Sequence, residues 1–442
     1  MSTARSESRP GSGRARRWVG GLLLAAVSTL LVLGIAEAAL RLAGERVLPA
    51  WGWGWSESPY RADAFPVAGQ VNQLGLRGRP IAYDDDDFVV VIAGDSYTEA
   101  GHQPFEDMPE RLLEAALRVG QEAAGTAGAV GAVGPGGAVG PGGRARAVKV
   151  FSLASAGWGQ DQQLLALRRY FEHYRADLVI AWLTPVNDFW ENSFIERSVT
   201  PAAGRLKPGF RLDAQGRLEG PRERHSELRL LDLLIRARAS AQQAAEPAMV
   251  LAEREMRRWN AGLPSPQRTP ADPAACPARE VAQDDLVAAV REGARALTVL
   301  SPEDLAGARS HFAPYGVPRS PREDYQIALT RSLLDRMAAL SRAHGSRFAA
   351  FYPRGSDIDR ALAAVRCVRE QASGRLYAVD LSDPLAPLTE PPPGFPVIAP
   401  IIASAEATTL SSRDWHLNRR GNEIALAGLA AELQRRGLLS PR

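Results

Sequence analysis

The segment that most restricts the fold of this chain is VVVIAGDSYTEA at residues 89–100, an apolar run that ends in a Gly-Asp-Ser turn. A run rich in β-branched residues and stopped by glycine predicts a strand buried on both faces. In parallel α/β sheets, ligands bind at the carboxyl ends of such strands. Ser96 is therefore a candidate nucleophile, provided that a base can reach it.

The pattern then repeats as strand, turn and helix. Strands are expected in the run before Gly94 and at residues 148–153, 178–183, 348–352 and 376–380. Helices are expected at residues 107–123, 161–174, 325–343 and 420–436. Successive strand–helix units predict a parallel sheet with helices on both faces, which is a three-layer α/β/α sandwich.

Two segments interrupt this pattern. Residues 191–322 are predicted to be a helical insertion, with helices at 228–259 and 284–300, that acts as a lid or a partner surface. Residues 125–143 contain AVGPGG twice, and this Gly/Pro repeat predicts a flexible surface loop. The expected order is a cytoplasmic tail (1–17), an anchor (18–40), a juxtamembrane linker (41–87), a catalytic domain (88–190), the insertion (191–322) and the rest of the catalytic domain (323–442).

The start of the chain predicts a membrane anchor. Residues 18–36 carry no charge and follow a basic cluster at Arg14, Arg16 and Arg17. About 20 apolar residues cross a bilayer, and upstream arginines favour a cytoplasmic start. We therefore expect a single-pass inner-membrane protein whose catalytic domain lies on the extracytoplasmic (periplasmic) side. The alternative is a cleaved signal peptide with Ala36-Glu37-Ala38 as its cleavage site, although signal h-regions usually span about 7–15 residues.

Composition argues against two other classes. The net charge is only +3 and no basic-aromatic pattern indicates nucleic acid binding. The two cysteines, Cys276 and Cys367, lack the spacing of a metal cluster, so no metal site is expected. They could pair in an oxidising compartment, and the sequence leaves this open. The acidic run at residues 84–87 lacks the spacing of a calcium loop and is expected to be a solvated turn.

The best candidate for the base is His416, in the segment Arg413-Asp414-Trp415-His416-Leu417-Asn418. Histidine both takes and returns a proton near neutral pH. Asp414 would hold the proton of one ring nitrogen so that the other nitrogen faces Ser96. Of the other histidines, His102 lies beyond the turn with no carboxylate beside it, and His173 is expected to be structural. The remaining three are in polar, loop-like contexts: His225, His311 and His344.

Acyl transfer also needs donors for the oxygen that becomes negative. Gly157 could present its backbone N–H, Asn187 its side-chain amide, and Ser96 its own N–H. Taken singly, Gly157 could be an ordinary turn glycine and Asn187 an ordinary helix cap.

Together these segments resemble the SGNH hydrolase family, the GDSL esterases and lipases. GDSYTEA matches the nucleophile block with Ser96, SLASAGWG the glycine block with Gly157, TPVND the asparagine block with Asn187, and DWHLNRRG the histidine block with Asp414 and His416. Two departures are that Pro185 replaces a usual glycine and that one residue, where many members have two, separates Asp414 from His416. The resemblance implies a flavodoxin-like α/β/α fold and no cofactor.

The resemblance implies a serine-dependent ester hydrolase that acts on an O-acyl ester, with acetyl on a cell-envelope glycan as the expected substrate. An alternative is a polysaccharide O-acetyltransferase, because exported transferases with an Asp-x-His-x-Asn pattern look similar. A third reading is an inactive anchored scaffold that binds an envelope partner through residues 191–322. The α/β-hydrolase pattern Gly-x-Ser-x-Gly fits poorly, since Thr98 replaces the second glycine.

Overall fold

The structure is a computed structural model that describes residues 12–43, 69–128, 147–193, 196–197, 205–206, 209–222, 230–231, 233–234, 270–276, 279–300, 312–370 and 373–440. The start of the expected tail, most of the Gly/Pro loop and nearly all of the helix expected at 228–259 lie outside these residues. The chain divides into two units, Met1–Ala50 with Arg224–Gln242, and Trp51–Glu223 with Gln243–Arg442.

The first unit contains helix α1 (Ser12–Ala43). Its segment Trp18–Leu42 spans 25 residues with a mean hydropathy of 2.4 in its most apolar stretch, and no residue of that stretch is buried. This length and composition suffice to cross a bilayer, a test that a signal sequence near the N-terminus also passes. Among the described residues, α1 is the one helix with these properties.

The second unit is built on a five-stranded, wholly parallel sheet of order β13-β10-β3-β1-β2. Its strands are β1 (Phe88–Gly94), β2 (Val148–Ala154), β3 (Leu178–Trp182), β10 (Arg347–Phe351) and β13 (Val397–Ile398). The chain first moves outward from β1 to β2 and then crosses back to β3. The crevice outside the carboxyl ends of β1 and β3 is therefore the topological switch point, where open α/β sheets bind ligands.

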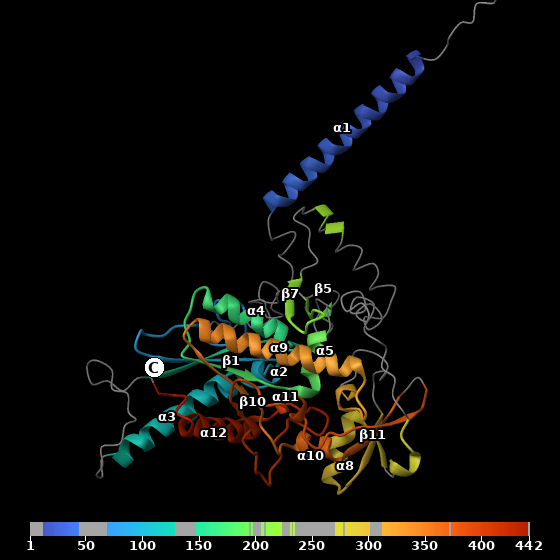
Figure 1. The fold of residues 1–442 in the computed structure, drawn as a ribbon. Helices are drawn as coiled ribbons and strands as arrows, with labels where there is room; N and C mark the ends of the chain where they lie inside the picture. Colours follow the sequence, from blue (N-terminus) through green and yellow to red (C-terminus); the bar gives the residue numbers. More distant parts are fainter. Residues whose placement is uncertain are drawn as a thin grey trace, which may run out of the picture. The chain divides into compact units, whose positions relative to one another are not determined.

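Alternate residues of β1 enter two separate cores, as a strand buried on both faces requires. Val89 and Val91 pack in the core that includes α4 (Gln160–Phe171) and α9 (Pro321–Ala343). Val90 and Ile92 pack in the core that includes α3 (Pro109–Gly128) and α12 (Arg419–Arg435). Figure 1 shows these two helix pairs on opposite faces of the sheet, which confirms the expected layering of helix, sheet and helix.

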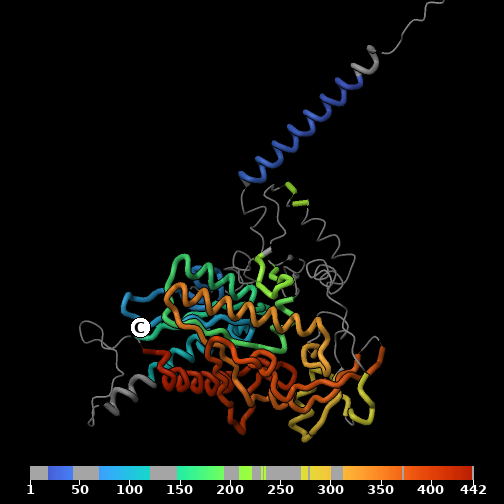
Figure 2. The backbone as a smooth tube through the Cα atoms, viewed as in Figure 1, coloured from blue at the N-terminus to red at the C-terminus, as the bar shows by residue number. Residues whose placement is uncertain are grey.

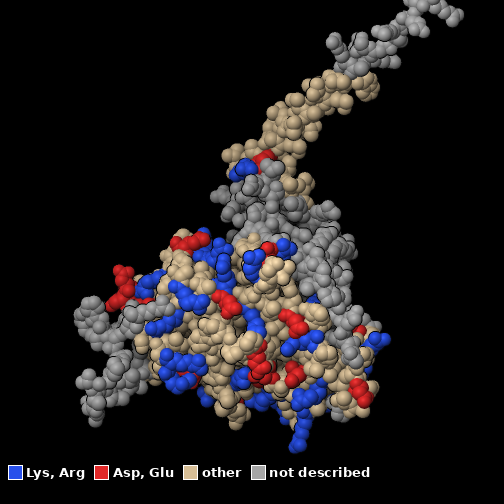
Figure 3. All heavy atoms as spheres, in the orientation of Figure 1, with Lys and Arg blue, Asp and Glu red and all other residues tan. Residues whose placement is uncertain are grey.

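Segments from the two ends of this unit lie side by side. Helices α3 and α12 are in contact, and Figure 2 shows the red C-terminal tube running along the teal segment that follows β1. On the face drawn in Figure 3, acidic and basic side chains are interspersed over this unit rather than gathered by sign. Many are paired across one helical turn, such as Arg419 with Glu423 at 2.9 Å.

The expected helical insertion is only partly helical in the residues that the structure describes, which also form strands. Part of it forms two short antiparallel pairs, β4 (Glu196–Arg197) with β5 (Arg205–Leu206) and β6 (Gly209–Leu212) with β7 (Leu218–Arg222). Another part supplies two strands of a second sheet, of order β12-β11-β9-β8. These strands are β8 (Arg279–Ala282), β9 (Leu297–Leu300), β11 (Val365–Arg369) and β12 (Leu376–Ala378).

The helix expected at residues 284–300 does not form over its full length, and one glycine explains why. Helix α8 (Leu286–Arg291) ends after six residues, and Gly293 follows with a φ of +93°, a left-handed conformation that favours glycine at a helix end. The apolar residues beyond it belong to β9. The periodicity therefore joined a short helix and a strand into one apparent helix.

The fifth strand is also not where the sequence places it. Residues 376–378 form β12, which pairs antiparallel with β11 in the second sheet. The fifth strand of the parallel sheet is β13, which has two residues and pairs with β10. A two-residue edge strand is too short to give a periodic pattern.

The expected linker also contains folded chain. Leu74, Leu76 and Ile81 are buried in the core with β1. The Asn72 side chain accepts hydrogen bonds from the N–H groups of Leu74 and Leu76 and donates to the Ser152 carbonyl at 3.3 Å. Residues 69–87 are therefore part of the folded second unit, not of a linker.

Cys276 and Cys367 form a disulfide, which answers the question that the sequence left open. It connects the segment before β8 to β11, and both residues are buried. Structural disulfides persist in oxidising compartments. The bond closes a loop with a sequence separation of 91 residues.

We expect the double variant Cys276→Ser/Cys367→Ser to lose roughly 2–5 kcal/mol of unfolding free energy, because the cross-link restricts the unfolded chain. Thermal unfolding of the wild type with and without reductant is the measurement. The reduced wild type should match the variant, and the variant should not respond to reductant. Equal midpoints for oxidised and fully reduced wild type, with reduction checked by thiol titration, would contradict a stabilising role.

Candidate active site

The strand register brings three of the predicted site segments to one edge of the sheet. Gly94 at the end of β1 pairs with Ala154 at the end of β2, and Ala93 pairs with Ala181 of β3. Ser96, Gly157 and Asn187 each follow one of these strands. All three therefore lie at the carboxyl edge, around the switch point.

A tight turn presents Ser96. Asp95 caps helix α2 (Ser96–Glu99) by accepting a hydrogen bond from the Tyr97 N–H at 3.0 Å. A Cβ added at Gly94 would overlap the Thr98 side chain, so this close approach requires glycine. Ser96 itself is half-buried, at the first residue of this helix.

The segment before α12 brings His416 to Ser96, although the two residues are 320 positions apart. His416 Nε2 lies 2.8 Å from Ser96 Oγ, and His416 Nδ1 lies 2.6 Å from Asp414 Oδ1. The Asp414 carboxylate also accepts the main-chain N–H of His416 at 3.1 Å. The three predicted residues thus form one continuous hydrogen-bonded series.

The surroundings of Asp414 keep its carboxylate charged, as an acceptor of the His416 hydrogen bond requires. Its partial burial raises the pKa, but hydrogen bonds from the ring and main chain of His416 outweigh burial and leave the pKa below the usual value. The carboxylate is therefore charged near neutral pH. It favours the tautomer with the proton on Nδ1, which leaves the Nε2 lone pair directed at the hydroxyl.

Gly157 has a backbone conformation that requires glycine, with a φ of +71°. Its neighbour Ala156 donates its N–H to the Glu99 carboxylate at 3.0 Å, which ties the turn after β2 to helix α2. Among the described residues, the N–H groups of Ser96 and Gly157 have no hydrogen-bond partner. Both are therefore free to serve as oxyanion donors, and that role stays a prediction.

Asn187 lies in the first turn of α5 (Pro185–Ser193) and is half-buried. Pro185 begins this helix, where its missing N–H costs nothing, so the departure from the family's glycine leaves a regular backbone. The side chains of Thr184 and Asn187 both favour the charged form of Asp95. The amide thus faces the turn that holds Ser96.

Two buried carboxyl groups lie behind the turn. Burial raises the pKa of Asp95, against a hydrogen bond from Tyr97 and the nearby His416. Burial, reinforced by the charge of Asp95, raises the pKa of Asp188 to about 8. Asp188 also accepts the Thr184 N–H at 2.8 Å at the start of α5.

Sequence reasoning missed the residues that hold the two halves of the site together. The Tyr97 hydroxyl donates to the Trp415 carbonyl at 3.0 Å, and the Gln103 amide donates to the Leu417 carbonyl. Arg77 donates to the carbonyls of Glu99, Ala100 and Gln103. No sequence signal marks these bonds, because their acceptors are main-chain atoms.

His102 was also dismissed by position, and the structure places it beside His416. The chain reverses after α2 at Ala100, whose φ of +48° is left-handed. The ring centroids of His102 and His416 are 5.0 Å apart. Alanine is not a residue typical of this conformation, so the sequence gives no sign of the reversal.

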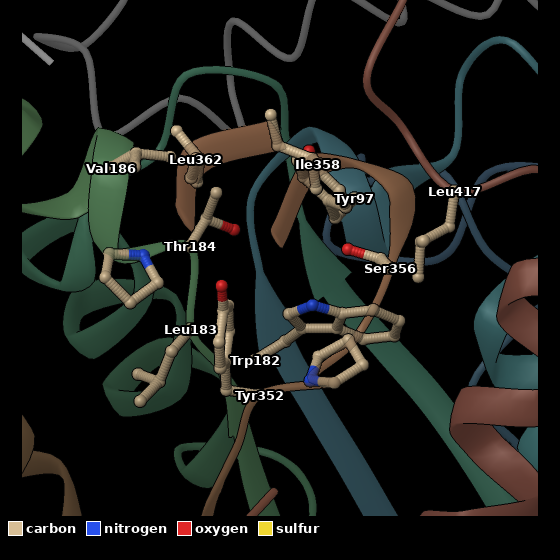
Figure 4. A pocket seen from close by; sticks show the side chains of 12 residues that line it. Tyr97, Trp182, Leu183, Thr184, Val186, Tyr352, Ser356, Ile358, Leu362 and Leu417 are labelled. Atoms are coloured by element: carbon tan, nitrogen blue, oxygen red, sulfur yellow. The ribbon is translucent and has the colours of Figure 1, made fainter. Parts of the chain in front are cut away.

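A small, mainly apolar cavity borders the site (Figure 4). Tyr97 adjoins Ser96, Leu417 adjoins His416, and Val186 adjoins Asn187 in the sequence. Figure 4 shows Val186, Ile358 and Leu362 on one side of the cavity and Trp182 and Tyr352 on the other. Ser96, Asp414 and His416 do not themselves line this cavity.

No family model matches this sequence, and no curated protein matches it at a significant level.

The raised pKa of Asp188 predicts a pH dependence of stability. The folded chain retains a proton that the unfolded chain releases above its ordinary pKa of 3.8, so stability falls as the pH rises from about 4 to about 8. We expect the variant Asp188→Asn to flatten this fall. Chemical denaturation at pH 5, 6.5 and 8 is the measurement, with the exposed Asp324→Asn as the control for loss of a carboxylate. Parallel slopes for wild type and Asp188→Asn would contradict the assignment.

Proposed function

We propose that this protein is a serine-dependent ester hydrolase. The observation that carries the proposal is the series from Ser96 Oγ to His416 Nε2 at 2.8 Å and from His416 Nδ1 to Asp414 Oδ1 at 2.6 Å. This geometry matches the nucleophile, base and orienting carboxylate of serine hydrolases on unrelated folds. The sequence blocks that resemble SGNH hydrolases support the same assignment.

In the proposed reaction, His416 Nε2 takes the proton of Ser96 as Oγ attacks the ester carbonyl. The N–H groups of Ser96 and Gly157 and the amide of Asn187 stabilise the oxyanion. The intermediate collapses when His416 returns its proton to the leaving alcohol, and an acyl-Ser96 ester remains. Water, deprotonated by the same imidazole, then attacks this ester and releases the acid. The serine chemistry needs no cofactor.

The acyl group is proposed to be short, because the cavity lined by Tyr97 and Leu417, the sequence neighbours of Ser96 and His416, is small and mainly apolar. An acetyl ester on a cell-envelope glycan fits this size and the proposed location. The acyl-enzyme could also pass its acyl group to a sugar hydroxyl, which would make the protein an O-acyltransferase with the same site.

The proposed location is the extracytoplasmic side of the inner membrane, with α1 as a single-pass anchor. Two observations support it. Helix α1 is long and apolar enough to span a bilayer. The second unit contains a structural disulfide, a bond that is rare in reducing compartments.

We expect Ser96→Ala to abolish both labelling by a fluorophosphonate probe and hydrolysis of p-nitrophenyl acetate. Intact-protein mass spectrometry would show one adduct in the wild type and none in the variant. The exposed Ser382→Ala, whose serine bonds Asp380, is the matched control and should be labelled normally. A wild type that resists the probe as fully as Ser96→Ala would favour the inactive scaffold.

We expect Asn187→Ala to lower kcat by about 10²–10³ with little change in KM, since an oxyanion donor acts mainly in the transition state. Initial-rate kinetics with p-nitrophenyl acetate would measure this, and thermal unfolding would check the fold. A raised KM with an unchanged kcat would assign Asn187 to substrate binding instead.

Adding an oligosaccharide acceptor to the wild-type assay separates the two fates of the acyl group, because transfer that outruns hydrolysis identifies a transferase.

A further inference from the structure

A second histidine stands at the mouth of the proposed site. His102 is exposed, on the loop that follows the reversal at Ala100. Its ring is tilted by 47° to that of His416, with 5.0 Å between the centroids. It also lies close enough to Asp414 to lower the pKa of that carboxyl, as the smallest of the contributions there. The reaction proposed above gives His102 no role.

His102, Asp414 and His416 together form a set of metal-ligand atoms. One ring nitrogen of each histidine and one oxygen of Asp414 all lie within 4.8 Å of one another. Around Zn²⁺, with bonds of about 2.0–2.1 Å, two such atoms are roughly 3.3 Å apart. Because His102 is exposed, its side chain has room to rotate and close this difference. Two imidazoles, one carboxylate and an open side are the ligand pattern of zinc sites that keep a water.

We propose that His102, Asp414 and His416 bind a divalent transition metal ion of the Zn²⁺ type, and that the bound ion blocks the serine chemistry. The binding half of this proposal stands alone, and the inhibitory half rests on the proposed function. Imidazole nitrogen selects zinc and its neighbours over Mg²⁺ and Ca²⁺, which prefer oxygen ligands. The sequence predicted no metal site because these ligands come from segments far apart in the chain.

The structure shows why binding and catalysis would exclude each other. Asp414 Oδ1 and His416 Nδ1 share one proton at 2.6 Å in the free site. An ion bound to Asp414 and to Nδ1 takes the lone pair on that nitrogen, so the proton of the neutral ring moves to Nε2. Nε2 then donates and can no longer accept the proton of Ser96. No net proton is released, and the ion can leave when it is chelated.

Direct binding tests the site without reference to activity. The full chain in detergent, freed of metal with a chelator, would be titrated with ZnCl₂ by calorimetry, and with CoCl₂ by its visible absorption. We expect one site in the wild type and an affinity at least tenfold weaker in His102→Ala and in Asp414→Asn. His173→Ala removes a histidine that is also exposed, beside Glu172 at the end of α4, and should bind as the wild type does. MgCl₂ should not compete.

Inhibition tests the second half. The ratio of the p-nitrophenyl acetate rate with and without ZnCl₂ would be measured within each variant. We expect the half-inhibiting concentration to rise at least tenfold in His102→Ala and to stay unchanged in His173→Ala, with full recovery on adding EDTA. Equal zinc affinity in the wild type and His102→Ala, or no binding, would overturn the site. Zinc binding that depends on His102 in a chain with no esterase activity would instead keep the site and reject the proposed function.

Discussion

The geometry of the site depends on how the segment that carries His416 docks against the segment that follows β1. The bonds that dock it reach main-chain carbonyls on both sides of the histidine, from Tyr97 to Trp415 and from Gln103 to Leu417. Arg77 holds the segment that follows Ser96 by donating hydrogen bonds to three more main-chain carbonyls. Buried hydrogen bonds of this kind are expensive to leave unmade. The backbone on both sides of His416 therefore places the imidazole, in addition to its own hydrogen bonds to Asp414 and Ser96.

A second polar network fixes the other wall of the site. The Asn192 amide donates to Gln160 at 2.6 Å and to Thr330 at 2.9 Å, which joins α5 to α4 and α9. A Cβ at Gly159 would meet Asn192 Oδ1, so the start of α4 approaches α5 as closely as glycine allows. These contacts hold α5 against both α4 and α9. Asn187, in the first turn of α5, therefore has a fixed position at the edge of the sheet.

The sequence predicted the parts of the fold that have long apolar periods. Strands β1, β2, β3 and β10 and the four large helices fall close to where their patterns place them, because burial on both faces leaves an unbroken apolar run. The second sheet was missed since its strands are short and come from segments far apart in the chain. The first folded segment was missed because Leu74, Leu76 and Ile81 are spaced by turn residues and give no period.

The residues of the candidate site also fall into those that the sequence predicted and those that it missed. Ser96, Asp414 and His416 could be predicted as a set because the proposed chemistry restricts the residue type at each position. His102 was not, since its place beside His416 follows from a left-handed alanine that no pattern marks. The path of the loop after Ala100 decides whether His102 lies near His416. The hydrogen bonds that hold this loop have main-chain acceptors, so the residue types do not reveal them.

The exposure of the site suits the proposed substrate. The side chains of His416 and Asp414 keep 26% and 36% of their exposure, so water reaches the hydrogen bond between them and weakens it. A deeper pocket would strengthen that pair but would exclude a bulky alcohol. The small cavity lined by Tyr97, Val186 and Leu417 and the partial exposure of His416 and Asp414 instead suit the proposed substrate, an ester with a short acyl group and a large alcohol, such as an acylated glycan. The same exposure leaves the His102 side chain room to turn toward Asp414 and His416, so the proposed access for a large substrate and for a metal ion have one structural cause.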